Sequence, residues 1–365
     1  MTNSSVPIKK THAYQRIIQV VLIAAVAISA FLVLQRLLVP KYASTVLEGG
    51  MVREYYDAVK NHDVIFLGDC EAYTSYSPVT LWDEYGITSY IRGSPQQLVW
   101  HSYYLLEDTL RYETPKVVVF SVLAMQYGEP QSEPYNRLTL DDMPLSLTKI
   151  NAIAASRTQG EDWLSYIFPF FRYKDRWREL SSEDFRYFFN QPRVTINGYS
   201  LRSDVLPSGF LPDPIRRADY SFSDKAYYYL ERMVELSKEN GITLILAKAP
   251  TLYPHWYKEW DDQIASFAQE HGISYINFID FIDDIALDFS EDTFNAGISL
   301  NVYGAEKLTR YFADILCDQI DFMSDSNDAK SIEYWNDLSA LYHTVILRQQ
   351  EEISLTGKIT SLLMN

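Results

Sequence analysis

A thiol stands directly after the first apolar run of the soluble part of the chain. Residues 64–73 read VIFLGDCEAY, so Gly68, Asp69 and Cys70 follow a run typical of a buried strand. Ligands of open α/β sheets bind at the carboxyl edge of the strands, which is where Cys70 would then lie. A cysteine there is a candidate nucleophile once it is deprotonated. The alternative is a small side chain buried under a loop.

Few side chains in the sequence could deprotonate Cys70. Asp69 and Glu71 flank it, and negative neighbours raise the pKa of a thiol. His255, in the loop KAPTLYPHWYKEW, is the candidate for a displaced base, and the alternative is a half-exposed loop imidazole among aromatic residues. Asp292 is a candidate acid to orient a base, and the alternative is a solvated loop carboxylate.

The elements that would position these residues alternate between strands and helices. Five short apolar runs predict buried strands, at residues 64–67, 87–91, 117–122, 242–247 and 273–278. Helical patterns lie between or after several of them, at residues 95–111, 223–240, 256–271 and 303–320. This alternation predicts an α/β fold, a three-layer α/β/α sandwich with a five-stranded parallel sheet.

The alternation is interrupted after the third strand by a stretch rich in aromatic and charged residues. We interpret this stretch as a mainly helical insertion. The expected division is a tail and anchor (1–40), a linker (41–62), the α/β domain (63–124 and 221–320), the insertion (125–220) and a C-terminal helical appendage (321–365).

Composition excludes several classes of protein. The 365 residues include 48 acidic and 32 basic side chains, for a net charge of −16. A chain this acidic repels phosphate backbones, so no nucleic-acid partner is expected. Two cysteines and six scattered histidines show neither a disulfide framework nor paired metal-ligand spacing, so no metal and no cofactor are expected.

An uncharged run near the N-terminus predicts a membrane anchor. Residues 17–34 read IIQVVLIAAVAISAFLVL, and with the apolar residues up to 39 they reach the ~20 residues needed to cross a bilayer. Lys9, Lys10 and Arg16 precede the run, which favours a cytoplasmic N-terminus. We therefore expect a single-pass protein of the plasma membrane with its main domain outside.

At these positions the sequence resembles the SGNH/GDSL hydrolases. Gly68-Asp69-Cys70 is similar to the family's GDS block, with cysteine in place of serine. The run SLNVYGAEKLTRYFADIL at residues 299–316 is similar to its closing block, and YIRGSPQQ at 90–97 to the block with the oxyanion-hole glycine, here Gly93. The family's oxyanion-hole asparagine falls at Ser121, which reaches less far. The resemblance covers roughly residues 63–124 and 221–320.

The sequence departs from the family where its base and acid stand. Ser299 replaces the histidine, and the acid position falls on Asn295 or Ala296, neither of which ionises. Because a hydroxyl cannot replace an imidazole as a general base near neutral pH, ordinary triad catalysis is not expected.

Two functions follow from the resemblance. One is a membrane-anchored esterase or O-acyltransferase that uses Cys70 on acyl (acetyl) esters of envelope or extracellular polysaccharide. The other is a non-catalytic binding or assembly subunit that partners a membrane-bound O-acyltransferase. The 28 Tyr, 18 Phe and 7 Trp suit stacking on sugars, although aromatic side chains also fill cores.

Overall fold

The structure is a computed structural model that describes residues 8–40, 47–209, 211, 213–322 and 329–364. Parts of the expected tail (1–7), linker (41–46) and C-terminal segment (323–328) therefore lie outside the described residues.

The chain forms two compact units. One unit comprises Met1–Lys41 with Leu164–Gln191, and the other comprises Tyr42–Trp163 with Pro192–Asn365. The second unit contains the sheet, so the long insertion expected between the third and fourth strands is shared between the two units.

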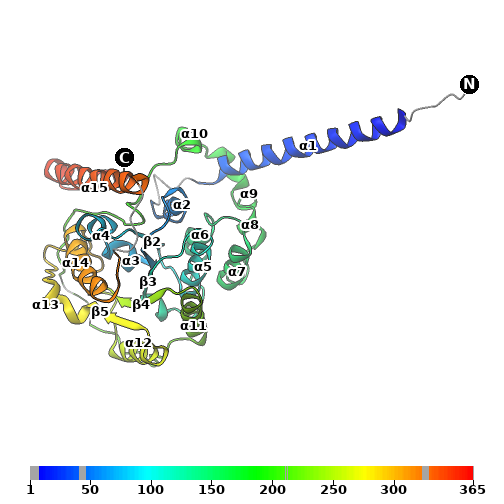
Figure 1. Cartoon of the computed structure of the whole chain (residues 1–365). Coiled ribbons are helices and arrows are strands. Elements are labelled where there is room, and N and C mark those ends of the chain that lie inside the picture. Colours follow the sequence, from blue (N-terminus) through cyan, green and yellow to red (C-terminus); the bar gives the residue numbers. More distant parts are fainter. Residues whose placement is uncertain (1–7, 41–46, 210, 212, 323–328, 365) are drawn as a thin grey trace, which may run out of the picture. The chain divides into compact units, whose positions relative to one another are not determined.

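The second unit is built on a five-stranded parallel sheet (Figure 1). Its strands are β1 (Val64–Gly68), β2 (Ser89–Gly93), β3 (Val117–Ser121), β4 (Thr243–Lys248) and β5 (Ser274–Asn277), in the order β2-β1-β3-β4-β5. The predicted parallel sheet is confirmed, with strand ends displaced by at most two residues. β2 begins later than predicted because Ile87 and Thr88 donate their backbone N–H groups outside the ladder, to Leu81 O and Asp63 Oδ2.

Helices cover both faces of this sheet. Successive strand residues point to opposite faces, and Phe66 of β1 and Val119 of β3 belong to one large cluster of buried side chains. This cluster also contains residues of α3 (Cys70–Ser75), α4 (Pro78–Tyr85), α14 (Val302–Gln319) and α15 (Ala329–Thr356). On the other face, α5 (Val99–Thr109) contacts β1 and α11 (Asp224–Glu239) contacts β4, while α12 (Lys258–His271) contacts β5. The predicted three-layer α/β/α sandwich is confirmed.

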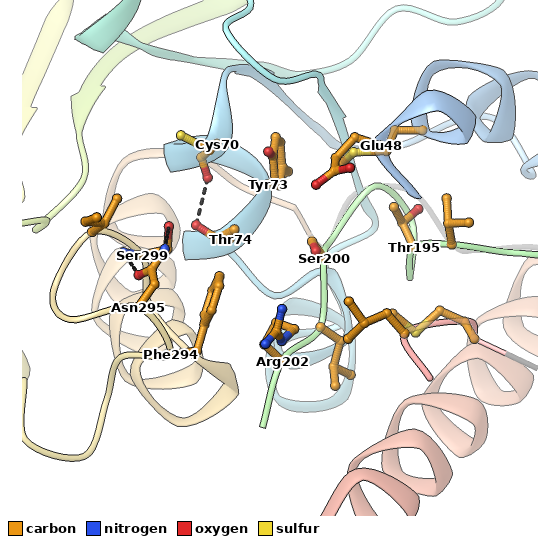
Figure 2. A pocket seen from close by; sticks show the side chains of 16 residues that line it. Glu48, Cys70, Tyr73, Thr74, Thr195, Ser200, Arg202, Phe294, Asn295 and Ser299 are labelled. Atoms are coloured by element: carbon orange, nitrogen blue, oxygen red, sulfur yellow. Dashed lines mark hydrogen bonds between the residues drawn. The ribbon is translucent and has the colours of Figure 1, made fainter. Parts of the chain in front are cut away.

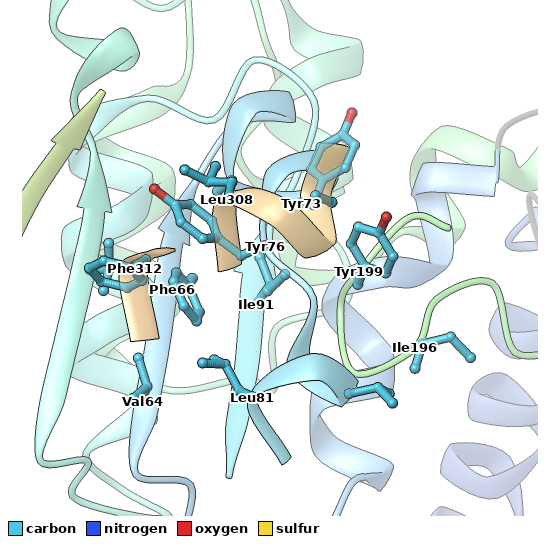
Figure 3. Packing of buried hydrophobic residues seen from close by; sticks show 14 of the residues in the cluster. Val64, Phe66, Tyr73, Tyr76, Leu81, Ile91, Ile196, Tyr199, Leu308 and Phe312 are labelled. Carbon is cyan, nitrogen blue, oxygen red and sulfur yellow. The ribbon is translucent and has the colours of Figure 1, made fainter. Parts of the chain in front are cut away.

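Aromatic side chains fill the core of the first face. Phe66 stacks on Tyr76 with ring centroids 4.5 Å apart, and Phe312 of α14 packs against both rings (Figure 3). Burial of one such side chain contributes about 1.5–3 kcal/mol. Trp335 of α15 stacks on Trp82 of α4 at 5.5 Å, so the C-terminal helix is part of the core of the sheet unit.

Short helices make up the remaining described elements. Within the sheet unit they are η1 (Leu47–Gly50), α2 (Met51–Asp57), η2 (Val122–Gln126), α6 (Glu133–Leu140), α7 (Leu147–Ser156), η4 (Phe278–Phe281) and α13 (Ile282–Ile285). The described residues between 192 and 223 (192–209, 211 and 213–223) have no helix or strand, apart from an isolated bridge between Ile196 and Tyr199.

The first unit combines the N-terminal helix with four short ones. α1 (Ile8–Leu38) contacts α9 (Phe170–Tyr173), η3 (Lys174–Arg178) and α10 (Ser182–Phe189), and α8 (Leu164–Ile167) precedes them. Tyr14–Leu38 is long and apolar enough to cross a membrane, and its most apolar 18-residue window has a mean hydropathy of 2.9. None of its most apolar 18-residue window is buried within the chain. Its orientation, and the plasma membrane as its location, stay predictions.

Candidate functional site

Cys70 lies where β1 ends and α3 begins. The Asp69 side chain caps this helix by accepting a hydrogen bond of 3.1 Å from the backbone N–H of Glu71. Gly68 lets β1 pass close to β3, because a Cβ atom at this position would lie 2.6 Å from Cβ of Ser121. The sequence therefore places the thiol at the carboxyl edge of the sheet, as its pattern predicts.

Cys70 lines a pocket of about 240 Å³ in the sheet unit. Figure 2 shows this pocket, which is walled by α3, the loop at 194–202, the loop at 294–299 and the C-terminal tail. Its lining residues are Glu48, Met51, Cys70, Tyr73, Thr74, Val194, Thr195, Ser200, Leu201, Arg202, Phe294, Asn295, Ile298, Ser299, Leu362 and Met364. Three residues singled out from the sequence, Cys70, Asn295 and Ser299, are thus brought together.

Asn295 and Ser299 bind each other across a tight loop. The backbone N–H of Ser299 donates to Asn295 Oδ1 at 2.6 Å, and Asn295 Nδ2 donates to Ser299 Oγ at 3.1 Å. Ala296 and Gly297 turn the loop with φ values of 60° and 92°. Asn295 and Ser299, which the sequence resemblance assigns to the positions of the family's acid and base, therefore bind each other, and neither side chain ionises.

Asp292 is bound to a lysine of α14 and to the backbone of its own loop. Its carboxylate forms an ion pair with Lys307 at 2.6 Å and accepts the backbone N–H of Asp288 at 2.8 Å. Asp292 is buried, and these bonds tie its loop to α14. This side chain therefore has a structural explanation within the fold.

Ser121 donates its hydroxyl to a buried carboxylate. Ser121 Oγ lies 3.4 Å from Glu71 Oε2, and Ser121 does not line the pocket. Its hydroxyl is therefore engaged inside the protein in this structure. Its role as an oxyanion donor stays a prediction.

Glu71 is held by a lysine that sequence reasoning did not single out. Lys248, the last residue of β4, is fully buried and places Nζ 2.6 Å from Glu71 Oε1. Nζ also donates to the backbone carbonyl of Ala249 at 2.7 Å and to Thr251 Oγ1 at 3.0 Å. Thr251 Oγ1 in turn donates to Glu71 Oε1 at 2.6 Å. The sequence feature that could have identified Lys248 is its position at the end of the apolar run ITLILAK.

Gly93 is closely packed. A Cβ atom there would lie 3.1 Å from Tyr73 Cδ1 and 3.2 Å from the carbonyl oxygen of Gly68, so a larger residue would require these neighbours to shift by a few tenths of an ångström. Gly93 and Gly68 are paired in the β1–β2 register. Gly93 does not line the pocket, and its role as an oxyanion donor stays a prediction.

His255 is not among the residues that line the pocket. It follows a cis Tyr253–Pro254 bond, and its ring contacts the ring of Tyr253 with centroids 5.8 Å apart. Among the described residues that line the pocket with Cys70, none is a histidine. The assignment of His255 as a displaced base therefore gains no support from the lining of the pocket.

The surroundings of Cys70 disfavour its thiolate. Burial raises the pKa of the Cys70 thiol well above its usual range, and the neighbouring carboxylates of Asp69 and Glu71 raise it further. Burial, with the charge of Glu71, also raises the pKa of Asp69. Backbone N–H groups at the start of α3 act in the opposite direction but are outweighed. Near neutral pH the pocket therefore holds a protonated thiol.

Among the comparisons with known proteins, only the comparison with solved structures finds similar proteins. No family model matches the chain, and no curated protein matches it. A protein from Desulfitobacterium hafniense, described as lipolytic and of the G-D-S-L family, aligns with 70% of this chain and 100% of its own at 14% identity, with a TM-score of 0.35. A protein from Bacteroides fragilis, described as an acylhydrolase, aligns with 73% of this chain and 94% of its own at 10% identity and a TM-score of 0.35.

A variant of an acetyl-xylooligosaccharide esterase from a Geobacillus aligns with 73% of this chain and 98% of its own, at 10% identity and a TM-score of 0.34. The strand order and the meeting of Cys70 with Ser299 in one pocket stand independently of these alignments. They agree with the resemblance of the sequence blocks to the SGNH/GDSL hydrolases.

Proposed function

We propose that this chain is a membrane-anchored binding subunit of SGNH-like fold whose pocket holds an acyl ester of a sugar without triad catalysis. The observation that carries the proposal is the Asn295–Ser299 pair. Its two hydrogen bonds of 2.6 and 3.1 Å join the positions of the acid and the base to each other. The raised pKa of Cys70 supports the same conclusion, because a protonated thiol is a poor nucleophile.

The lining of the pocket supports a ligand with both hydroxyl and apolar groups. Thr195, Ser200 and Ser299 present hydroxyl groups, while Phe294 and Ile298 present apolar surface. The volume of 240 Å³ is slightly below the ~300–1,000 Å³ of typical small-molecule sites, so it suits a single acylated sugar unit of a polysaccharide.

The anchor supports an extracytoplasmic location for this pocket. Lys9, Lys10 and Arg16 precede the apolar part of α1, which supports a cytoplasmic N-terminus and an extracytoplasmic sheet unit. Family resemblance supports a membrane-bound O-acyltransferase as the partner. In this proposal the subunit presents or receives the acylated polymer beside that enzyme.

A second candidate function is acyl transfer through Cys70, and the observation that favours it is that Cys70 lines the pocket. In this reaction the sulfur attacks the acyl carbonyl, the ester C–O bond breaks, and the thiol proton passes to the leaving hydroxyl. The resulting thioester then passes its acyl group to water or to a glycan hydroxyl. The raised pKa of the thiol weighs against the first step.

Binding by the full chain in detergent tests the proposal. Saturation-transfer NMR with acetylated and deacetylated oligosaccharides should show contact with the acetylated forms. Ser299→Leu should abolish this contact because the added side chain enters the pocket, whereas Ser266→Leu on the exposed face of α12 should retain it. Equal signals from both folded variants would show that the ligand binds elsewhere. No signal from any acetylated sugar would contradict the ligand class.

A further inference from the structure

Residues 164–191 contact the end of the apolar helix. The ring of Phe31 in α1 lies 5.3 Å from that of Phe170 and 6.2 Å from that of Phe168. Arg176 Nη1 donates to the backbone carbonyl of Leu38 at 3.0 Å, and the Arg36 guanidinium lies over the ring of Phe188. Figure 1 shows α9 and α10 beside this end of α1.

These contacts set the level of the segment along α1. The 25 residues of Tyr14–Leu38 are about 37 Å long at 1.5 Å per residue, more than the ~30 Å hydrocarbon core. The contacted residues, from Phe31 to Leu38, occupy the last two turns. If α1 spans a bilayer, they lie where the helix passes from hydrocarbon to headgroups, and residues 164–191 lie there too.

The segment exposes aromatic side chains at this level. Phe171 is 48% exposed, Trp177 59%, Phe185 56% and Phe189 86%. Phe185 and Phe189 are four residues apart on α10 and share a face, while Asp184 and Tyr187 of the same helix are buried. Exposure of this apolar surface to water is unfavourable in free energy, whereas aromatic rings are favoured at a membrane interface.

Basic side chains are concentrated in one stretch of the segment. Residues 170–178 read FFRYKDRWR and carry four basic side chains against one acid, whereas residues 164–191 as a whole carry five basic and four acidic side chains. Basic residues next to a membrane helix are attracted to anionic lipid headgroups. Aromatic and basic side chains therefore coincide at the end of α1.

We propose that residues 164–191 form an interfacial element in the headgroup layer of the membrane that α1 crosses. The exposed aromatic side chains enter the acyl boundary, and the basic side chains bind anionic lipid headgroups. The inference rests on the membrane anchoring proposed above and is independent of the pocket and its ligand. It makes the segment, with α1, a second attachment of the chain to the bilayer.

Spin labels on the full chain in vesicles test the proposal. In a Cys70→Ala/Cys317→Ser background, a label is placed at Phe171→Cys or Phe189→Cys. Val26→Cys serves as the hydrocarbon reference, and Tyr228→Cys, at 50% exposure in the other unit, as the matched control. The ratio of collisions with oxygen to collisions with a water-soluble nickel chelate reports depth.

The expected ratio at 171 and 189 is clearly above that at 228 and below that at 26. It should rise further when phosphatidylglycerol replaces phosphatidylcholine. Lys174→Gln/Arg178→Gln should remove this rise, and Lys238→Gln/Lys258→Gln should keep it. If the collision ratio for labels at positions 171 and 189 equals that at 228, while the label at 26 lies in hydrocarbon, the inference is overturned. The exposed aromatic side chains of residues 164–191 would then be assigned to contact with a protein partner. A water-exposed label at 26 would overturn the anchoring itself.

Discussion

Replacing Lys248 with methionine would leave the Glu71 carboxylate buried without its cation. Lys248 is fully buried, and its Nζ lies 2.6 Å from Glu71 Oε1. Removal of one partner from a buried ion pair costs about 3–5 kcal/mol, because the remaining charge is desolvated and uncompensated. Thr251 and Ser121 still donate to Glu71 in the variant, which favours the lower end of this range.

A second lysine provides a matched control. Lys258 Nζ lies at the same distance of 2.6 Å from Asp262, but the two side chains are 81% and 60% exposed. Exposed pairs of this i,i+4 kind contribute little because water and salt screen them, so Lys258→Met should change stability little. The two pairs share a lysine–carboxylate distance, so the contrast between the variants reports burial together with the two further hydrogen bonds that Lys248 makes, to Ala249 and Thr251.

Urea unfolding of the full chain in mild detergent, followed by tryptophan fluorescence, measures both effects. We expect Lys248→Met to lower the free energy of unfolding by about 3 kcal/mol or more. Adding Glu71→Gln should recover part of this loss because the buried charge is removed. A loss for Lys248→Met as small as that for Lys258→Met would refute the reasoning.

Two further predictions concern titration. In a Cys317→Ser variant, iodoacetamide should alkylate Cys70 slowly at neutral pH, and the rate of alkylation should still be rising above pH ~9. The reason is that burial and two carboxylates raise the pKa of this thiol. An alkylation rate that levels off near neutral pH would contradict this. Burial also raises the pKa of Glu54 from 4.5 to about 7, against hydrogen bonds from Thr195 and Val194. Because the folded state holds this proton more tightly than the unfolded chain, the associated stability is complete below about pH 4.5 and is lost as pH rises through about 7. At about 1.4 kcal/mol per pKa unit, the rise from 4.5 to about 7 corresponds to a loss of at most about 3.5 kcal/mol. The wild type should therefore lose more stability than Glu54→Gln between about pH 5 and 8 in urea unfolding, and parallel pH profiles for the two would be the contrary result.

The parts of the fold that depend on local pattern were predictable from the sequence. The apolar runs of β1, β3 and β4 identified the sheet, and Gly272 ends α12 in the left-handed conformation expected of a helix C-terminus. The resemblance also brought Cys70, Asn295 and Ser299 to one site. These features follow from short stretches of chain.

The features that were not predicted depend on contacts distant in sequence. Lys248 binds Glu71, which lies 177 residues away in the sequence. A lysine at the end of a strand is ordinarily solvated. Residues 164–191 were expected within a single insertion, but they contact α1 through Phe31 and Phe170. The hydrogen bonds between Asn295 and Ser299 require the loop between them to turn through Ala296 at φ 60°. An alanine in a sequence does not predict a positive φ value.

Acyl release by the full chain, compared with that of Cys70→Ala, tests the central claim most directly. Aryl acetates and acetylated oligosaccharides serve as substrates, and a variant carrying Cys70→Ser, Asn295→Asp and Ser299→His tests whether a restored triad acts in this pocket. The proposed function predicts that the wild type and Cys70→Ala release acetate at the same background rate. Turnover by the wild type that is abolished in folded Cys70→Ala would contradict it and establish catalysis by the thiol.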